Sequence, residues 1–450
     1  MYNKAIFNLK KHLFKRALLQ SQKACINYQK MPSSKRETLS LQQRIDLIKY
    51  AYHYCPFYKK IYDKYGFHPS QIKSEKDWRN VPIIEKNMIK RHTPEFFSVL
   101  ANQNKLCPSS TGGSTGMPLV VYKSKNVHYE VLAWRALSWY GIGPWDNEAI
   151  VHRRVPTTVF KLWLNRGLWW PTKRSYLNAT NISDAKIRIF IDEIKKFRIK
   201  WVVGYCGSLE YVADYIINNT IVIDSVKLVW STSSPLTQIV REKLEKAFRC
   251  PVMDQYGCCE MGNIALQKPT ENCLTVNSDY VHIDIVNGNT HVPEGVVGDI
   301  CITDLHCKEF PLIKYRLGDR ASIISSMNKS HDGFPKLSFV KGRTTDMLPL
   351  PNGDVLDGSY LTTICDKYIE YISCYQIYQE SNFNIIFYVV PKEDNPFTDN
   401  IISRIKNHLS KISNNQIDIK IKKVSSIPDF AGKRKFIISE LTTTNSSKLI

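Results

Sequence analysis

The alternation of short apolar runs with helical patterns in the middle of the chain constrains its fold most strongly. Trp201–Tyr205 predicts a buried strand ending in a turn, and Val226–Trp230 predicts another strand followed by a loop rich in serine and threonine. A helical pattern from Gln238 to Phe248 comes next. Strand, loop and helix in alternation predict an α/β fold whose sites lie at the strand ends.

The C-terminal part of the chain follows a different pattern. Residues 371–390 alternate as paired strands do, residues 401–409 are helical in pattern, and residues 417–424 alternate again. Pro349, Pro351 and Gly353 punctuate the chain before this part. We therefore predict a large domain over residues 1–345 and a small α+β domain over residues 346–450.

Residues 1–30 predict a basic amphipathic helix. Its apolar stripe contains Ile6, Leu9, Leu13 and Ala17, and lysines and arginines supply its charge. We expect this helix to pack on its own domain, as most amphipathic helices do.

The net charge of +21 comes from 62 Lys and Arg against 41 Asp and Glu. Such an excess attracts anions, including nucleotides, acidic lipid and acidic polysaccharide. The sequence contains no zinc-finger spacing, RNP-like strand or basic helix joined to heptads, so no nucleic-acid partner is expected. The 12 cysteines form no Cys-x-x-Cys pair, and neither a signal peptide nor a bilayer-length apolar run is found, so we expect a cytoplasmic protein with reduced thiols.

The strongest local motif runs from Ser109 to Pro118 and reads SSTGGSTGMP. Its glycines let the backbone approach a phosphate, its amide groups can form an anion nest, and its hydroxyls add donors. No lysine follows the last glycine, so the motif is not a Walker A loop. It leads directly into a predicted strand, PLVVY, which favours phosphate binding over a flexible linker.

Four weaker motifs follow along the chain. Residues 254–260 (DQYGCCE) place an aromatic ring beside a glycine and a carboxylate suited to a hard cation. Residues 314–319 (KYRLGD) present an aspartate after a glycine turn, which suits two ribose hydroxyls. Residues 341–346 (KGRTTD) lie at the predicted hinge, and residues 431–435 (AGKRK) put a lysine on a glycine turn. Taken singly, each motif could also be a solvated turn, a surface ion pair or a basic tail.

In this order, over more than 300 residues, the five motifs resemble the signature set of the adenylate-forming superfamily. That superfamily includes acyl-CoA synthetases, luciferases and peptide-synthetase adenylation domains. The sequence is most similar to the phenylacetate–CoA ligase-like branch, particularly to members associated with capsular polysaccharide synthesis, from about His53 to Glu440. The resemblance implies a large multi-layer N-terminal domain and a small mobile α+β C-terminal domain.

The resemblance also implies a role for each matching residue. The ATP phosphates would be cradled by the glycine-rich loop, which comprises Thr111, Gly112, Gly113, Ser114, Thr115 and Gly116. Adenine would be lined by Ser233, Ser234 and Pro235 and stacked on Tyr256, which precedes Gly257. Asp319 would hold the ribose and Glu260 would bind magnesium. Arg343 would contact the nucleotide at the hinge, and Lys433 would be the mobile catalytic lysine.

The implied activity is that of an AMP-forming ligase that uses ATP and Mg²⁺ to convert a carboxylic acid into an acyl-adenylate. The acyl group would then pass to an acceptor, which is coenzyme A by default and alternatively a sugar amine or hydroxyl, or a carrier-protein thiol. The acid could be aromatic, short-chain or an amino acid. Its pocket would involve Tyr205, Gly207, Ser208 and Gly257.

The sequence departs from the family pattern at several positions. Cys259 precedes the magnesium-binding glutamate where relatives often have threonine, and Thr345 stands at a hinge position that is usually aspartate. His331–Pro335 replaces a Cys-x-Cys-Gly segment, which argues against a cysteine-bound zinc there. The alternative is therefore a degenerate nucleotide-binding protein without ligase activity. Contact of the N-terminal helix with a membrane or an anionic polymer remains open as an addition to the enzyme hypothesis.

Overall fold

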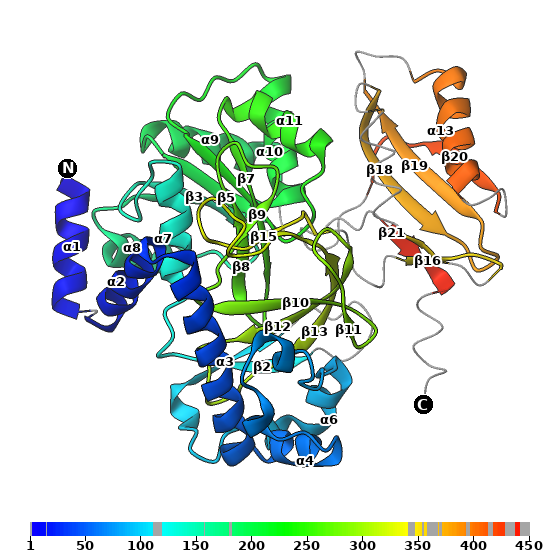
Figure 1. The fold of residues 1–450 in the computed structure, drawn as a ribbon. Coiled ribbons are helices and arrows are strands. Elements are labelled where there is room, and N and C mark those ends of the chain that lie inside the picture. The colour runs from blue at the N-terminus through cyan, green and yellow to red at the C-terminus, as the bar shows by residue number, and fades with distance from the viewer. Residues whose placement is uncertain are drawn as a thin grey trace. The chain divides into compact units, whose positions relative to one another are not determined.

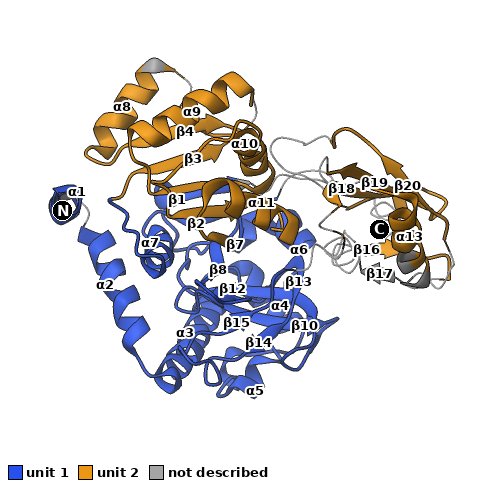
Figure 2. Cartoon of the chain, turned by 90° about the horizontal axis from the view of Figure 1, so that it is seen from above, with its two compact units in different colours: residues 1–145, 254–340 blue, residues 146–253, 341–450 orange. Residues whose placement is uncertain are grey.

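The computed structural model describes residues 2–14, 16–110, 119–156, 158–179, 182–340, 347–352, 355–357, 368, 371–392, 397–412, 417–427 and 437–441. The chain divides into two compact units, each built from two stretches of sequence (Figure 2). Unit 1 comprises Met1–Trp145 and Asp254–Val340, and unit 2 comprises Asp146–Met253 and Lys341–Ile450. Within the described residues, no helix combines the length and the apolar character needed to cross a membrane.

The first stretch of unit 1 is mainly helical and contains one hairpin (Figure 1). Its helices are α1 (Tyr2–Phe14), α2 (Arg16–Lys30), α3 (Ser33–Tyr54), α4 (Pro56–Lys64), α5 (Glu75–Trp78), α6 (Lys86–Phe96) and α7 (Glu130–Trp139), with two 3₁₀ turns at Pro69–Gln71 and Gln103–Lys105. Strands β1 (Leu106–Ser110) and β2 (Val120–Ser124) pair antiparallel between α6 and α7.

The second stretch of unit 1 is made of antiparallel strands. Its strands are β7 (Val252–Cys258, which begins in unit 2), β8 (Gly262–Gln267), β9 (Leu274–Val276), β10 (Val281–Asn287), β11 (Thr290–His291), β12 (Gly298–Asp304), β13 (Tyr315–Ala321), β14 (Ile323–Ser325) and β15 (Lys336–Leu337). One sheet has the order β11-β10-β12-β13, and a second run has the order β14-β15-β9-β8-β7. Their inner faces share one apolar core with α3, α4 and α6.

The first stretch of unit 2 has the predicted α/β alternation (Figure 1). It comprises β3 (Glu148–His152), α8 (Val159–Trp169), β4 (Arg174–Asn178), α9 (Asp184–Lys196), β5 (Trp201–Tyr205), α10 (Cys206–Asn218), β6 (Leu228–Thr232) and α11 (Gln238–Phe248). The strands are parallel in the order β6-β5-β3-β4. Residues of α9, α10 and α11 pack with these strands in one apolar core, so β5 and β6 are continuous apolar runs.

The predicted elements of this stretch are confirmed with one shift. The strand at Trp201–Tyr205 and the helix at Gln238–Phe248 have the predicted bounds. Thr237 begins the helix, because its side chain accepts a hydrogen bond from the Val240 amide, and Arg249 ends it in a left-handed conformation. The strand predicted at Val226–Trp230 instead covers β6, two residues further on.

The second stretch of unit 2 is the predicted α+β arrangement. It comprises β16 (Met347–Pro349), β17 (Val355–Asp357), β18 (Ile372–Gln379), β19 (Ile385–Pro391), α13 (Asp399–Ile412), β20 (Ile419–Lys423) and β21 (Ile437–Ser439). Strands β18 and β19 form the predicted antiparallel pair in a sheet of order β20-β19-β18-β21. The domain boundary near residue 346 remains a prediction.

The N-terminal segment forms two helices rather than one, and three of the four residues of the predicted apolar stripe are exposed. Leu9 and Leu13 are 57% and 63% exposed. Helix α1 instead packs through Phe7, whose ring centroid lies 5.5 Å from that of Trp134, while α2 buries residues such as Leu18 and Tyr28. The aromatic contact between Phe7 and Trp134 therefore positions α1, and the spacing of the aliphatic side chains did not predict this contact.

A buried ion pair joins α7 to the loop before β10. The guanidinium of Arg135 donates to both carboxylate oxygens of Asp279 at 2.9 and 2.8 Å, and it also donates to Asn277. The side chains of the pair are 1% and 8% exposed. Removal of one partner would leave the other charge buried without compensation.

We expect Arg135→Met to lower the free energy of unfolding by about 3–5 kcal/mol, because Asp279 then remains charged and buried. The double variant Arg135→Met with Asp279→Leu should lose clearly less. Urea unfolding followed by tryptophan fluorescence measures both. Equal losses in the single and the double variant would contradict this account of the pair.

Candidate functional site

The two strands that flank the glycine-rich motif form a hairpin in unit 1. Ser110 of β1 lies opposite Val120 of β2, and β2 confirms the strand predicted after the motif. Thr111 to Gly116 themselves lie outside the described residues. At the end of β1, the Ser109 hydroxyl donates to the Cys259 carbonyl at 2.7 Å. The hairpin is therefore tied to the turn that carries Glu260.

Strand β7 presents the aromatic residue of the second motif. Strands β7 and β8 pair antiparallel, with an irregularity between Tyr256 and Gly257. A Cβ atom at Gly257 would lie 2.4 Å from the Gly262 carbonyl oxygen, so only glycine fits there without moving backbone. This close approach forms the tight turn that carries Glu260.

Tyr256 and Asp319 are neighbours in unit 1. The Tyr256 hydroxyl donates a hydrogen bond to Asp319 Oδ2 at 2.9 Å, and the tyrosine is only 7% exposed. Burial, together with the Asp319 carboxylate, raises the pKa of Tyr256 well above its usual value, so its hydroxyl keeps its proton and remains a donor.

Asp319 is not presented by a turn, as its sequence predicted. It lies inside β13, at an irregularity where Asp299 pairs with Arg320 and Cys301 pairs with Arg316. Gly318 adopts a φ of 87° there, which explains the glycine. The basic residues of the same motif are structural: Lys314 donates to backbone carbonyls of residues 78 and 79, and Arg316 pairs with Glu85 and Asp299.

Glu260 is a buried carboxylate, 6% exposed. Its Oε1 accepts a hydrogen bond from the Tyr315 hydroxyl at 3.3 Å, and within the described residues no lysine or arginine forms an ion pair with it. A buried carboxylate needs a counter-charge, and hard divalent cations bind carboxylate oxygens. The donor chemistry of Glu260 therefore fits magnesium.

The loop predicted to line adenine follows β6 in unit 2. Ser233 has a φ of 83°, a left-handed conformation that is uncommon for a residue with a side chain. Such strain concentrates at ligand-binding positions. Ser233 is exposed and Ser234 is half-buried, and the Pro235 carbonyl accepts a weak hydrogen bond from the Cys206 thiol at 3.7 Å.

A polar cluster that the sequence did not reveal lies at the carboxyl ends of the parallel strands of unit 2. His152 ends β3 and Tyr205 ends β5, and the Tyr205 oxygen lies 2.6 Å from His152 Nε2. Burial, with the charges of Arg153 and Arg154, lowers the pKa of His152, so its imidazole is neutral at pH 7.

Two serines add to this end of the sheet. Ser231 lies beside Gly204 in the β5–β6 ladder, and Ser208 lies in the first turn of α10. Both hydroxyls are buried and lack a hydrogen-bond partner among the described residues. Unpaired buried hydroxyls are rare and suit a polar group of a ligand. Of the predicted acid-pocket residues, Tyr205, Gly207 and Ser208 lie here. His152 was not predicted from the sequence; the one feature that could have pointed to it is its position at the end of a strand.

The predicted site residues thus form two groups. Tyr256, Gly257, Glu260 and Asp319 lie together in unit 1, and Ser233, Ser234 and Pro235 follow a strand of unit 2. Arg343 and Lys433 lie outside the described residues.

Lys336 holds the segment around His331 in place through ion pairs. The Lys336 ammonium is buried and donates to Glu271 and to Asp332 at 2.8–3.0 Å. Burial would raise the pKa of Asp332, but hydrogen bonds from Lys268 and Lys336 hold it well below its usual range. Glu271, His331 and Asp332 have ligand atoms within 4.8 Å of one another, but these lysines already neutralise the carboxylates.

Comparison with curated proteins finds similar sequences. No family model matches the chain. It is 22% identical over 395 residues to protein CapK of Staphylococcus aureus, across 86% of this chain and 85% of that protein. It is 24% identical over 323 residues to the phenylacetate–coenzyme A ligase of Escherichia coli K12, across 69% of this chain and 72% of that enzyme.

Structural comparison agrees. A crystal structure of 2-hydroxyisobutyryl-CoA ligase in the postadenylation state matches with a TM-score of 0.72 at 15% identity, over 93% of this chain and 92% of that chain. The chain has the adenylate-forming ligase fold. Its resemblance to the phenylacetate–CoA ligase-like branch is confirmed by the sequence relatives. The amide bond synthetase McbA of Marinactinospora thermotolerans also has this fold, with a TM-score of 0.54 at 14% identity over 76% of this chain and 70% of that chain.

If Tyr256 stacks on adenine, as the sequence resemblance implies, Tyr256→Phe should weaken ATP binding about three- to tenfold, because it removes one hydrogen bond to a carboxylate and keeps the ring. Tyr256→Ala should weaken binding further because the aromatic surface is also lost. Calorimetric titration with ATP measures the dissociation constants, with Tyr65→Phe, an exposed tyrosine of the same unit, as control. If the two Tyr256 variants bound ATP equally well, stacking by this ring would be excluded.

Proposed function

We propose that this chain is an AMP-forming ligase that activates a carboxylic acid as an acyl-adenylate and transfers the acyl group to an acceptor. One observation carries the proposal: the Tyr256–Asp319 pair and the buried Glu260 lie in one part of unit 1, with the turn of Glu260 hydrogen-bonded to the strand before the glycine-rich motif. Three of the residues expected to hold nucleotide and metal therefore lie in the same part of unit 1. The phenylacetate–coenzyme A ligase relatives support the same reaction class.

In the proposed first step, a carboxylate oxygen of the acid bonds to the α-phosphorus of ATP. The bond from that phosphorus to the bridging oxygen of the β-phosphate breaks, and pyrophosphate leaves with the electron pair. Negative charge gathers on the phosphoryl oxygens, so preorganised donors and cations lower the barrier. The amides of residues 111–116, Arg343 and Lys433 are the proposed donors, and Lys433 is the proposed mobile catalytic lysine.

The remaining nucleotide contacts fall to described residues. The Tyr256 ring would stack on adenine. The part of Ser233, Ser234 and Pro235 in adenine binding stays a prediction from the sequence resemblance. Asp319 would accept hydrogen bonds from ribose hydroxyls. Glu260 would hold magnesium, which supplies positive charge to the phosphate oxygens when bound.

The acid would bind at the strand ends of unit 2. The neutral His152 and the Tyr205 hydroxyl form a fixed pair there, and the Ser208 and Ser231 hydroxyls are available to polar atoms of a ligand. Ligands of open parallel sheets bind at this end of the strands. We therefore propose these four side chains as the residues that select the acid.

The proposed acceptor is coenzyme A, which the phenylacetate–coenzyme A ligase relatives use by their names. A sugar amine or hydroxyl in polysaccharide synthesis is a second class of acceptor. The sequence resemblance to capsule-associated members implies it, and the shared fold with an amide bond synthetase supports transfer to an amine. A carrier-protein thiol is a third.

Pyrophosphate release from ATP and magnesium, measured across a panel of carboxylic acids without acceptor, tests the first step. We expect acid-dependent release that falls by about a hundredfold or more in Lys433→Ala, because one preorganised cation is lost at the transition state. ATP binding should persist in this variant, and the neighbouring Lys435→Ala is the control. Unchanged release in Lys433→Ala would refute the role of that lysine, whereas ATP binding without release for any acid would favour a degenerate nucleotide-binding protein.

Tyr205→Phe tests the acid pocket. Loss of its hydroxyl removes the hydrogen bond to His152, so we expect the KM for the preferred acid to rise about fivefold or more while the affinity for ATP stays constant. Tyr211→Phe, one turn into the following helix and 43% exposed, is the matched control. If the KM for every acid in the panel were unchanged in Tyr205→Phe, the acid would bind at another site.

A further inference from the structure

Helix α8 has its apolar face turned to solvent. Phe160, Trp163 and Leu168 are 70%, 71% and 68% exposed, and Leu164 is 48% exposed. These positions recur at helical spacing, so they form one stripe. A surface helix of a globular protein normally buries such a stripe.

The polar side chains of α8 hold the helix to unit 2 instead. Asn165 Oδ1 accepts a hydrogen bond from the Tyr176 hydroxyl of β4 at 2.6 Å, and Arg166 Nη2 lies 3.5 Å from Glu193 Oε1 of α9. The helix begins at Thr158, whose side chain accepts from the Lys161 amide at 3.3 Å. The outward direction of the apolar stripe is therefore fixed by specific contacts.

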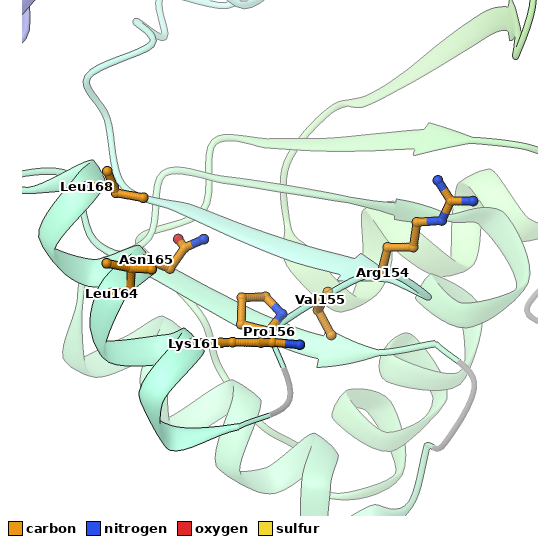
Figure 3. Close-up of a pocket in the computed structure, with 7 residues that line it drawn as sticks. All are labelled: Arg154, Val155, Pro156, Lys161, Leu164, Asn165 and Leu168. Atoms are coloured by element: carbon orange, nitrogen blue, oxygen red, sulfur yellow. The ribbon is translucent and has the colours of Figure 1, made fainter. Parts of the chain in front are cut away.

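The chain around α8 is basic in sequence, although Arg166 pairs with Glu193 of α9 and Arg174 pairs with Glu148 of β3. Residues 151–183 contain no acidic side chain and six basic ones, Arg153, Arg154, Lys161, Arg166, Lys173 and Arg174. A groove of about 450 Å³ opens beside the helix (Figure 3). It is lined by two cations and an apolar wall, formed by Arg154, Val155, Pro156, Lys161, Leu164, Asn165 and Leu168.

We propose that α8 is a membrane-surface helix that docks unit 2 onto an anionic phospholipid bilayer. Phe160, Trp163 and Leu168 would enter the boundary between head groups and acyl chains, which tryptophan favours. Arg153, Arg154 and Lys161 would lie against lipid phosphates. Apolar insertion and attraction of the basic side chains to anionic lipid both contribute to surface binding of this kind.

Charge complementarity favours lipid over a second copy of this chain. A two-fold interface through α8 would bring the same basic residues of both copies together, and like charges oppose such packing. An anionic bilayer instead neutralises these charges, and the net charge of +21 attracts the whole chain to it.

Co-sedimentation of the full chain with phosphatidylcholine vesicles, with and without phosphatidylglycerol, tests the proposal. We expect binding only to the vesicles with phosphatidylglycerol, weakened several-fold as salt rises from about 0.05 to 0.5 M. Phe160→Ser with Trp163→Ser should reduce the binding at least about tenfold, and Lys161→Glu should reduce it several-fold.

The matched control is Val99→Ser with Leu100→Ser, two apolar residues of unit 1 that are 69% and 62% exposed. Quenching of tryptophan emission by brominated acyl chains should fall in the Phe160/Trp163 variant and persist in this control. Acid-dependent pyrophosphate release without vesicles should be equal in all variants, so failure of this proposal is distinguishable from failure of the proposed ligase activity.

Three results would overturn the proposal. One is absence of binding of the unmodified chain to anionic vesicles. Another is that the Phe160/Trp163 variant binds anionic vesicles as well as the unmodified chain does. The third is a self-association, measured by sedimentation velocity, that this variant abolishes while the chain ignores vesicles, because α8 would then be an interface between copies.

Discussion

The hydrogen bond from Tyr256 to Asp319 connects two separate antiparallel strands, β7 and β13, and the candidate nucleotide site of unit 1 depends on it. It is maintained by backbone geometry at both ends. Gly257 permits the close approach to the Gly262 carbonyl, and Gly318 permits the irregularity that carries Asp319. Because burial keeps the tyrosine protonated, its phenol can donate throughout the physiological pH range. A ring and a carboxylate are thereby held as one rigid element.

The described part of this site is acidic although the chain as a whole is strongly basic. Glu260 and Asp319 are carboxylates, and ATP is itself an anion, so the proposed reaction requires cations from other sources. Magnesium on Glu260, Arg343 at the hinge and Lys433 near the C-terminus would supply them. The basic side chains that adjoin Asp319 in sequence, Lys314 and Arg316, are engaged in structural contacts instead. Excess positive charge in the composition therefore does not identify the cations of the site.

The connection from β3 to α8 carries two features of unit 2 within a few residues. His152 ends the strand and pairs with Tyr205, and Arg153 and Arg154 follow at once. These arginines contribute to lowering the pKa of His152, and Arg154 also lines the groove beside α8. Asn165 of α8 contacts the protein, whereas Phe160, Trp163 and Leu168 face solvent, so this helix contributes little to the core of unit 2. The exposed apolar stripe of α8 is a surface that a globular fold alone does not require.

The sequence by itself determined the alternation of strands and helices in unit 2, the paired strands of the C-terminal part and the family resemblance. These features depend on local periodicity, caps and short motifs, which are written in neighbouring residues. Only the tertiary structure decided that Asp319 lies at a strand irregularity rather than on a turn, that Phe7 rather than Leu9 and Leu13 packs α1, and that His152 meets Tyr205. It also decided that the apolar stripe of α8 is exposed, because periodicity gives the direction of a stripe relative to its helix and not relative to the protein. Each of these outcomes depends on contacts between segments distant in sequence, whose energies no local pattern contains.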